Sequence, residues 1–153
     1  MTYSLTRRAA LIGGACAAML ALTSVPSQAA AKIQRLVSPG GIEAWFVQDA
    51  TVPLIAMEYS FGGGASQDPP GKPGVGNLVA DLLDEGSGDL DSKTYHERLE
   101  RRAIELSFAS NRDQFRGSLR MLKDNKDEAY DLLRMALTSP RFEPKDVERI
   151  RAQ

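Results

Sequence analysis

The chain has 153 residues, of which 42% are hydrophobic and 25% are charged, and its formal net charge at pH 7 is −1. This is an ordinary globular composition, long enough for one domain. Acidic and basic residues are interspersed without a basic stripe, so we expect no nucleic-acid partner.

The first thirty or so residues differ from the rest. Arg7 and Arg8 precede an uncharged run, residues 9–25, that is followed by small residues. This pattern predicts a secretory signal peptide over residues 1–29, with cleavage after Ala29 or Ala31. The run is short for a membrane span, so we expect removal and no stable membrane anchor. The predicted location is periplasmic or secreted by the Sec route, and the paired arginines leave the twin-arginine route open.

The cysteine count constrains the mature protein. Cys16 lies inside the apolar run, and in a lipoprotein such a cysteine would be acylated. Gly13 and Gly14 stand where an apolar residue is expected before an acylated cysteine, so the sequence favours a cleaved signal peptide over a lipoprotein. Removal of this segment leaves no cysteine, and hence no disulfide and no thiolate nucleophile or ligand. Stability must come from a packed core.

Three strands are predicted next. Residues 32–37 and 42–48 flank the turn signal Ser38-Pro39-Gly40-Gly41 and predict a hairpin. A third strand opens at Pro53, and its predicted core face consists of Ile55, Met57, Tyr59 and Phe61. Residues 62–64 are all glycine, and glycine-rich loops can bind phosphate. Gly71-Lys72-Pro73, however, lacks the Ser/Thr that ends such a loop. We therefore expect the three glycines to let the backbone pass close to another element.

A short helix follows and ends at Gly86. Its predicted buried face repeats at helical spacing and consists of Val75, Leu78, Val79, Leu82 and Leu83. Its predicted outer face consists of Asn77, Ala80, Asp81 and Asp84. Positions 77, 80 and 81 have the spacing of an H-x-x-E-H zinc site, but none holds the required residue.

A second helix is predicted from Lys93 to about Arg102, capped by Asp91 or Ser92, with Tyr95, Leu99 and Ala103 buried. It carries His96, the only histidine of the chain. A catalytic zinc site usually has three protein ligands, two or three of them histidine, so this segment cannot assemble one alone. We expect His96 to be a surface residue.

The remaining chain predicts a second hairpin and two helices. Apolar residues occupy alternate positions over residues 104–108 and 115–121, which predicts the two strands. Asp124 or Asn125 is predicted to cap a third helix. Its apolar stripe consists of Ala129, Leu132, Leu133, Ala136 and Leu137. Pro144 begins a fourth helix with Glu143 and Asp146 at its acidic start and Val147 and Ile150 as its apolar line. The order of elements predicts an α+β fold, an antiparallel sheet with helices packed on one face.

Several of these segments resemble the insulinase (pitrilysin) zinc metallopeptidases. The resemblance is carried by residues 59–68, by Gly71-Lys72-Pro73-Gly74-Val75-Gly76, by Leu82-Leu83-Asp84-Glu85-Gly86-Ser87 and by residues 137–149. It implies that residues 30–153 are the N-terminal portion of such a peptidase domain, truncated at its C-terminus.

On the family pattern, Asn77 stands at the first histidine, Ala80 at the catalytic glutamate and Asp81 at the second histidine. The third ligand, a glutamate, would fall at or beyond the chain end, with Glu148 a weak candidate. The resemblance therefore implies no catalytic residue, no metal ligand and no cofactor in this chain. Zinc is expected only in a partner chain.

The resemblance implies an exported non-catalytic subunit, a pseudoenzyme that forms a heterodimer with a catalytic zinc-peptidase homologue. It would help to form the chamber and to bind a peptide or unfolded polypeptide substrate. Two alternatives remain open: a zinc-dependent metallopeptidase whose metal site is completed downstream, and an exported binding module with no peptidase role.

Overall fold

The computed structural model describes residues 32–153, and the predicted signal peptide with Cys16 lies outside the described residues. The chain divides into two units, Met1–Asp49 and Ala50–Gln153, which are described separately. Within residues 32–153, no helix is both long and apolar enough to cross a bilayer.

The described part of the first unit is the predicted hairpin. Strand β1 (Ile33–Val37) pairs antiparallel with β2 (Glu43–Val47). At the turn, the Ile42 amide donates to Ser38 Oγ over 2.9 Å, and Gly41 adopts a φ of +83° that favours glycine. Arg35 and Glu43 form a bidentate ion pair across the hairpin, with N–O distances of 2.8 and 2.7 Å. The hairpin predicted from the turn residues is confirmed.

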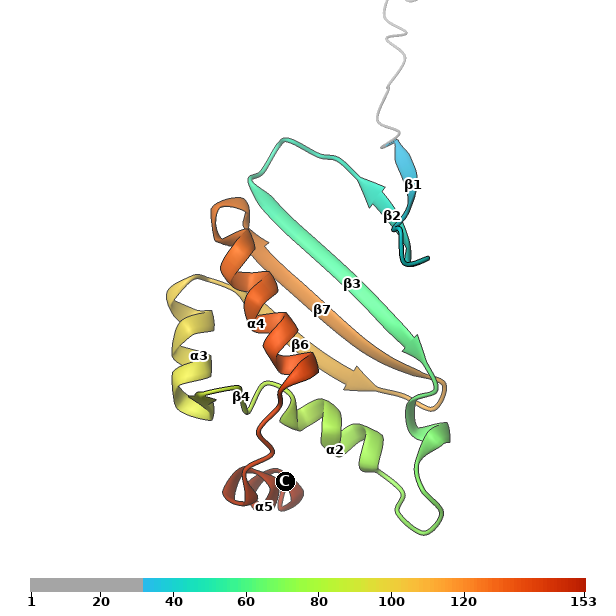
Figure 1. Cartoon of the computed structure of the whole chain (residues 1–153), viewed down its shortest axis with the longest axis vertical. Coiled ribbons are helices and arrows are strands. Elements are labelled where there is room, and N and C mark those ends of the chain that lie inside the picture. Colours follow the sequence, from blue (N-terminus) through green and yellow to red (C-terminus); the bar gives the residue numbers. More distant parts are fainter. Residues whose placement is uncertain (1–31) are drawn as a thin grey trace, which may run out of the picture. The chain divides into compact units, whose positions relative to one another are not determined.

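A three-stranded antiparallel sheet forms the base of the second unit (Figure 1). Its order is β3 (Leu54–Gly62), β7 (Gln114–Leu122) and β6 (Glu105–Ser110). Burial alternates along each strand, so a single face of the sheet is covered. Ile55 and Met57 pack against the core as predicted, but Phe61 is 55% exposed. The prediction for Phe61 is wrong because the cover over the sheet does not extend to the end of β3.

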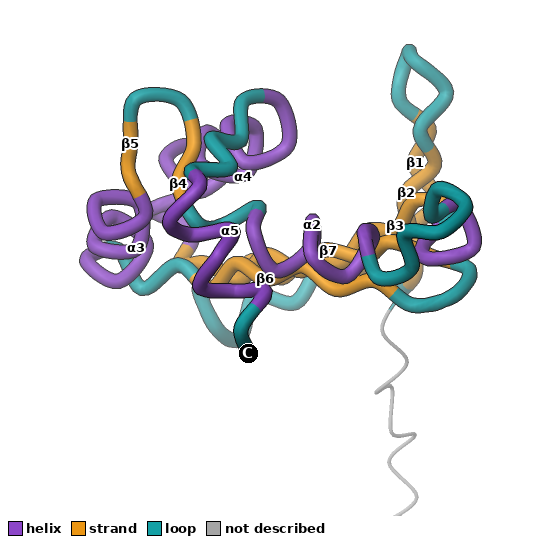
Figure 2. The backbone as a smooth tube through the Cα atoms, turned by 90° about the horizontal axis from the view of Figure 1, so that it is seen from below, coloured by secondary structure: helices purple, strands orange, loops and turns teal. Residues whose placement is uncertain are grey.

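Four helices accompany this sheet, and Figure 2 shows α3 and α4 on the same side of the strands. Their bounds are α2 (Val75–Leu82), α3 (Ser92–Arg101), α4 (Lys126–Thr138) and α5 (Pro144–Arg151). Two 3₁₀ turns, η1 (Gly64–Gln67) and η2 (Lys123–Asn125), precede α2 and α4. The segment after α2 forms a small antiparallel pair, β4 (Gly86–Ser87) with β5 (Leu90–Asp91), which the sequence did not predict. The α+β fold is confirmed.

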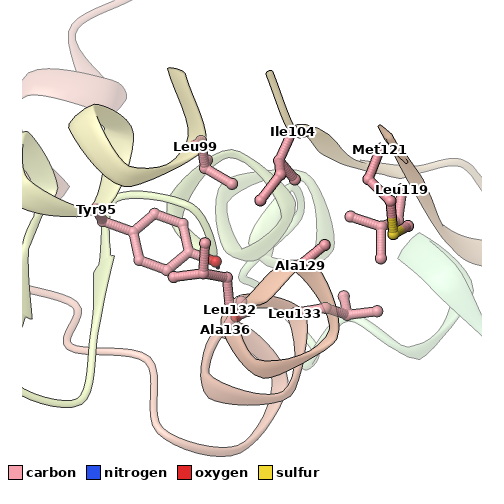
Figure 3. Close-up of a cluster of buried hydrophobic side chains, with 9 residues drawn as sticks. All are labelled: Tyr95, Leu99, Ile104, Leu119, Met121, Ala129, Leu132, Leu133 and Ala136. Atoms are coloured by element: carbon pink, nitrogen blue, oxygen red, sulfur yellow. Dashed lines mark hydrogen bonds between the residues drawn. The ribbon is translucent and has the colours of Figure 1, made fainter. Parts of the chain in front are cut away.

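The core lies between α3, α4 and the covered face of the sheet (Figure 3). Its buried members are Tyr95, Leu99, Ile104, Leu119, Met121, Ala129, Leu132, Leu133 and Ala136. The Tyr95 ring reaches toward Leu132, and its hydroxyl donates to the Leu132 carbonyl oxygen over 2.9 Å. Leu137, predicted to complete the buried stripe, is 38% exposed because the stripe turns away from the core at the end of α4.

The end of α3 and the start of α4 differ from the predictions. Ala103, predicted to be buried, is exposed and follows the end of α3 with a φ of +48°. Its left-handed conformation lets the Ile104 amide donate to the Leu99 carbonyl over 2.9 Å, which closes the helix end. Asn125 does precede α4, but its side chain donates to the Arg102 carbonyl over 2.7 Å and makes no cap bond.

Candidate functional site

Helix α2, which carries the degenerate zinc motif, is fixed at its N-terminus by Asp68. One carboxylate oxygen accepts from the Gly74 amide over 2.7 Å and the other accepts from the Gly76 amide over 2.8 Å. These bonds satisfy two amides that the start of a helix leaves without a partner. The sequence did not predict this role, because Asp68 precedes the helix by too many residues to match a capping motif.

The loop before α2 is fixed to the turn between β6 and β7. The Ala65 amide donates to the Asn111 carbonyl oxygen and the Ser66 amide to the Arg112 carbonyl oxygen, both over 2.8 Å. A Cβ atom at Gly64 would lie 2.1 Å from the Asn111 carbonyl oxygen. The prediction that the glycines after β3 allow a close backbone approach is confirmed at this position.

The three motif positions do not share one environment on α2. Asn77 and Asp81, one turn apart, are exposed, whereas Ala80 is only 3% exposed. A Cβ atom at Gly76 would lie 2.9 Å from Ser110 Oγ of β6, so the Gly76 face of the helix packs closely on that strand. The predicted outer position of Ala80 is wrong, because it lies one turn from Gly76 on this close-packed side.

The C-terminal end of α2 is tied to α3 and α5 through Glu85. Its Oε2 accepts from Ser92 Oγ over 2.6 Å and from Arg149 Nη2 over 2.5 Å. Arg149 also contacts Asp146 over 3.4 Å. Asp146 is only 6% exposed, and its Oδ2 has no hydrogen-bond partner among residues 32–153. Glu148, the weak third-ligand candidate, is exposed on α5.

His96 is half-buried on α3, a less exposed position than the sequence predicted. Its Nδ1 lies 2.9 Å from the Ser92 carbonyl oxygen, which assigns the proton to Nδ1. The ring meets Tyr95 edge to face, with centroids 6.4 Å apart. His96 therefore belongs to the packing around α3 and leaves Nε2 as its free nitrogen.

The described part of the chain offers no arrangement suited to a metal. Between residues 32 and 153, no group of three or more His, Cys, Asp or Glu side chains could hold a metal ion. Asn77 and Asp81 offer oxygen atoms on the exposed side of α2, and Ala80 offers no donor. Zinc favours nitrogen and sulfur ligands in a tetrahedral set, so these residues do not fit it.

The second unit corresponds to a known family of domains. The model of the insulinase family (peptidase family M16) matches residues 47–153. The chain belongs to the insulinase (peptidase M16) family. The resemblance inferred from the α2 segment and its flanking loops is confirmed.

The similar M16 proteins include chains described as lacking peptidase activity. Over 126 residues the chain is 26% identical to the "Non-peptidase homolog YmxG" of Helicobacter pylori, covering 82% of this chain and 29% of that protein. A structure described as the peptidase M16 inactive domain from Pseudomonas fluorescens aligns with a TM-score of 0.73 and 26% identity, covering 80% of this chain and 30% of that one.

A protease structure from Helicobacter pylori aligns with a TM-score of 0.66 and 15% identity, again over 80% of this chain and 30% of that one, and it supports the fold alone. The chain therefore spans about 30% of the length of these similar proteins.

Proposed function

We propose that this M16 chain is a non-catalytic subunit that helps to form a peptidase chamber and to bind a peptide or unfolded polypeptide together with a catalytic zinc-peptidase homologue. The observation that carries the proposal is on α2. Asn77, Ala80 and Asp81 occupy the three motif positions, while Asp68 anchors the start of the helix and Ala80 and Leu82 are buried.

The loss of the motif removes two chemical functions at once. A zinc peptidase needs ligands that hold the metal and a carboxylate that takes a proton from the attacking water. Asn77 and Asp81 stand in the ligand positions, and the buried methyl group of Ala80 cannot accept a proton. We therefore assign no catalytic step and no zinc to this chain, and we place both in the partner.

The retained packing explains why the helix persists without its chemistry. Asp68 fixes one end of α2, and the contacts of Glu85 with Ser92 and Arg149 fix the other. A helix held at both ends is a rigid wall element, which suits a subunit that shapes a chamber. The relatives described as a non-peptidase homolog and as an inactive M16 domain support the non-catalytic part of the proposal.

The proposed location follows from residues 1–29. Arg7 and Arg8 followed by an uncharged run support export to the periplasm or beyond, through the Sec route or the twin-arginine route. The catalytic partner would then have to be exported as well.

Reconstitution tests the proposal. The partner is an M16 chain of the same organism that keeps both histidines and the glutamate of the motif, and the substrate is an unfolded polypeptide. We expect little cleavage by the partner alone and strong cleavage after equimolar mixing, with the two chains eluting together in gel filtration.

Two controls define the result. A partner whose motif glutamate is replaced by glutamine should give no cleavage after mixing, because the reaction then lacks its base. A mixture that neither elutes as a complex nor cleaves faster than the partner alone would contradict the proposal and favour a binding module without a peptidase role.

A further inference from the structure

Phe142, in the loop between α4 and α5, has a backbone conformation that suits glycine better than phenylalanine. Its φ is +48°, in the left-handed region, where an L side chain crowds the following carbonyl oxygen. In the part of the chain that the structure describes, the other non-glycine residue with a positive φ is Ala103, which closes the end of α3. Phe142 closes no helix, because α4 ends at Thr138 and α5 begins at Pro144. Its conformation therefore needs another explanation.

The loop is held on both sides of Phe142. Before it, the Arg141 amide donates to the Gly86 carbonyl oxygen over 3.1 Å, and Arg141 Nη1 donates to the Gly88 carbonyl oxygen over 3.2 Å. After it, Glu143 Oε1 accepts from Arg141 Nε over 2.8 Å. Strained residues persist where their surroundings hold them in place, and these bonds fix both neighbours of Phe142.

The Phe142 ring contributes little to the fold. Its residue is 39% exposed and belongs neither to the buried core cluster nor to the hydrophobic side chains packed against that cluster. Among residues 32–153 the ring forms no aromatic pair. Glycine at this position would make the same turn without the strain. A contact outside the chain accounts for a strained and exposed ring better than the stability of the chain does.

The charged residues next to Phe142 in the chain are already paired with one another. Glu143 lies between Arg141 and Lys145, at N–O distances of 2.6 and 3.1 Å. At protein–protein interfaces, aromatic side chains are enriched in the buried centre and polar residues surround them. The loop has the residues of such a centre and its rim.

The fixed position of the ring favours a folded partner over an unfolded polypeptide. A ring held in one place suits one complementary pocket, whereas surfaces that accept many sequences are flexible. A second copy of this chain would have to supply an apolar pocket for the ring itself. Two hollows lie within the described residues, and both carry charged side chains: Asp84 and Glu100 in one, Lys93 and Lys145 in the other.

We propose that the Phe142 ring is an anchor that docks into an apolar pocket of the catalytic zinc-peptidase partner. The ion-paired side chains of Arg141, Glu143 and Lys145 form the polar rim of this contact. The assignment rests on the proposed function, because it takes the partner to be a folded M16 chain with an intact motif. It adds the place on this chain where that partner binds.

Three variants of the full chain separate the ring from the strain. Phe142→Ala removes the ring and keeps the strained φ, and Phe142→Gly removes both. Ala103→Gly is the matched control, because it removes the strain of a residue with the same φ of +48° at the end of α3. The affinity for the partner is measured by isothermal titration calorimetry. The motif glutamate of the partner is replaced by glutamine, so that nothing is cleaved during the titration.

Both Phe142 variants should bind the partner at least tenfold more weakly, because an aromatic anchor is lost, whereas Ala103→Gly should leave the affinity unchanged. In thermal unfolding of the isolated chain, Phe142→Ala should lower Tm by less than about 5 °C, because the ring lies outside the core. Phe142→Gly should have a Tm roughly 2–8 °C above that of Phe142→Ala, because glycine is not strained there. Ala103→Gly should gain a similar amount over the unmodified chain.

Unchanged affinity of Phe142→Ala would overturn the assignment of this contact and leave the proposed function in place. A larger fall in Tm or a loss of folding in Phe142→Ala would also overturn it, since the ring would then serve the chain itself. A dimer of the unmodified chain in gel filtration that Phe142→Ala dissolves would assign the ring to a second copy instead. No binding of the partner to the unmodified chain would contradict the proposed function and this contact together.

Discussion

Replacing Gly117 with alanine should destabilise the sheet, because this glycine makes room for a tyrosine. Gly117 lies in β7 directly opposite Tyr59 of β3. A Cβ atom at position 117 would lie 2.2 Å from both Cζ and Oη of Tyr59. Carbon atoms in contact prefer about 3.5–4.0 Å, so the ring or the strand would have to move by more than 1 Å.

The magnitude follows from two opposing effects. Overpacking of this kind typically costs about 1–3 kcal/mol, whereas the loss of glycine flexibility in the unfolded chain returns roughly 0.5–1 kcal/mol. We expect a net loss of roughly 1–2 kcal/mol in the free energy of unfolding. For a domain of about 100 residues this lowers Tm by roughly 5–15 °C. The readout is urea unfolding followed by far-UV circular dichroism, with an unchanged m-value.

Two further variants isolate the cause. Gly62→Ala is the matched control on β3, because an added Cβ there would meet no atom within 4 Å and the residue has no positive φ. It should leave stability unchanged or slightly raised. In a Tyr59→Leu background, which removes the end of the ring, Gly117→Ala should cost almost nothing. An equal cost of Gly117→Ala in both backgrounds, or a loss at Gly62 as large as at Gly117, would show that the contact with Tyr59 is not the cause.

Three other outcomes are expected. Ala103→Gly should raise the free energy of unfolding by about 0.5–1 kcal/mol in urea titrations, because alanine is strained at a φ of +48°; a loss would contradict this. Asp84→Asn should stabilise the chain at pH 7: burial raises the folded pKa of Asp84, so its charge penalises folding as pH rises above the unfolded pKa. The gain should vanish in acid, and a pH-independent gain would refute the charge argument. Asp68→Ala should cost roughly 1–3 kcal/mol and speed amide exchange in α2, because it leaves the amides of Gly74 and Gly76 without their acceptor; unchanged exchange would count against this anchor.

The elements were predictable from the sequence wherever their signal was local. The alternating apolar residues of β3 and β7 predicted strands, and the apolar stripe of α4 predicted a helix. Both predictions are correct because side-chain periodicity directly reflects backbone geometry. The hairpin turn at Ser38 and the first helical turn at Pro144 were likewise predicted from residue type.

Burial at element ends could not be predicted in the same way. Phe61 and Leu137 continue the correct pattern but lie beyond the reach of the covering elements, and Ala80 is buried because α2 approaches β6 closely. Each outcome depends on where another segment lies, which periodicity does not reveal.

Two sets of contacts that position the candidate site follow no local sequence pattern and were therefore missed. Glu85 and Arg149 are 64 residues apart in the chain, and nothing near either predicts their ion pair. The two bonds that Asp68 accepts from the Gly74 and Gly76 amides depend on the path of the loop before α2. The identity of the motif residues, by contrast, was fully visible in the sequence at positions 77, 80 and 81.

We propose that this M16 chain has no peptidase chemistry of its own. The most direct test measures the zinc content of the isolated chain by elemental analysis, together with its cleavage of an unfolded polypeptide with and without a chelator. We expect zinc well below one atom per chain and no cleavage under either condition. Stoichiometric zinc with cleavage that the chelator abolishes would contradict it.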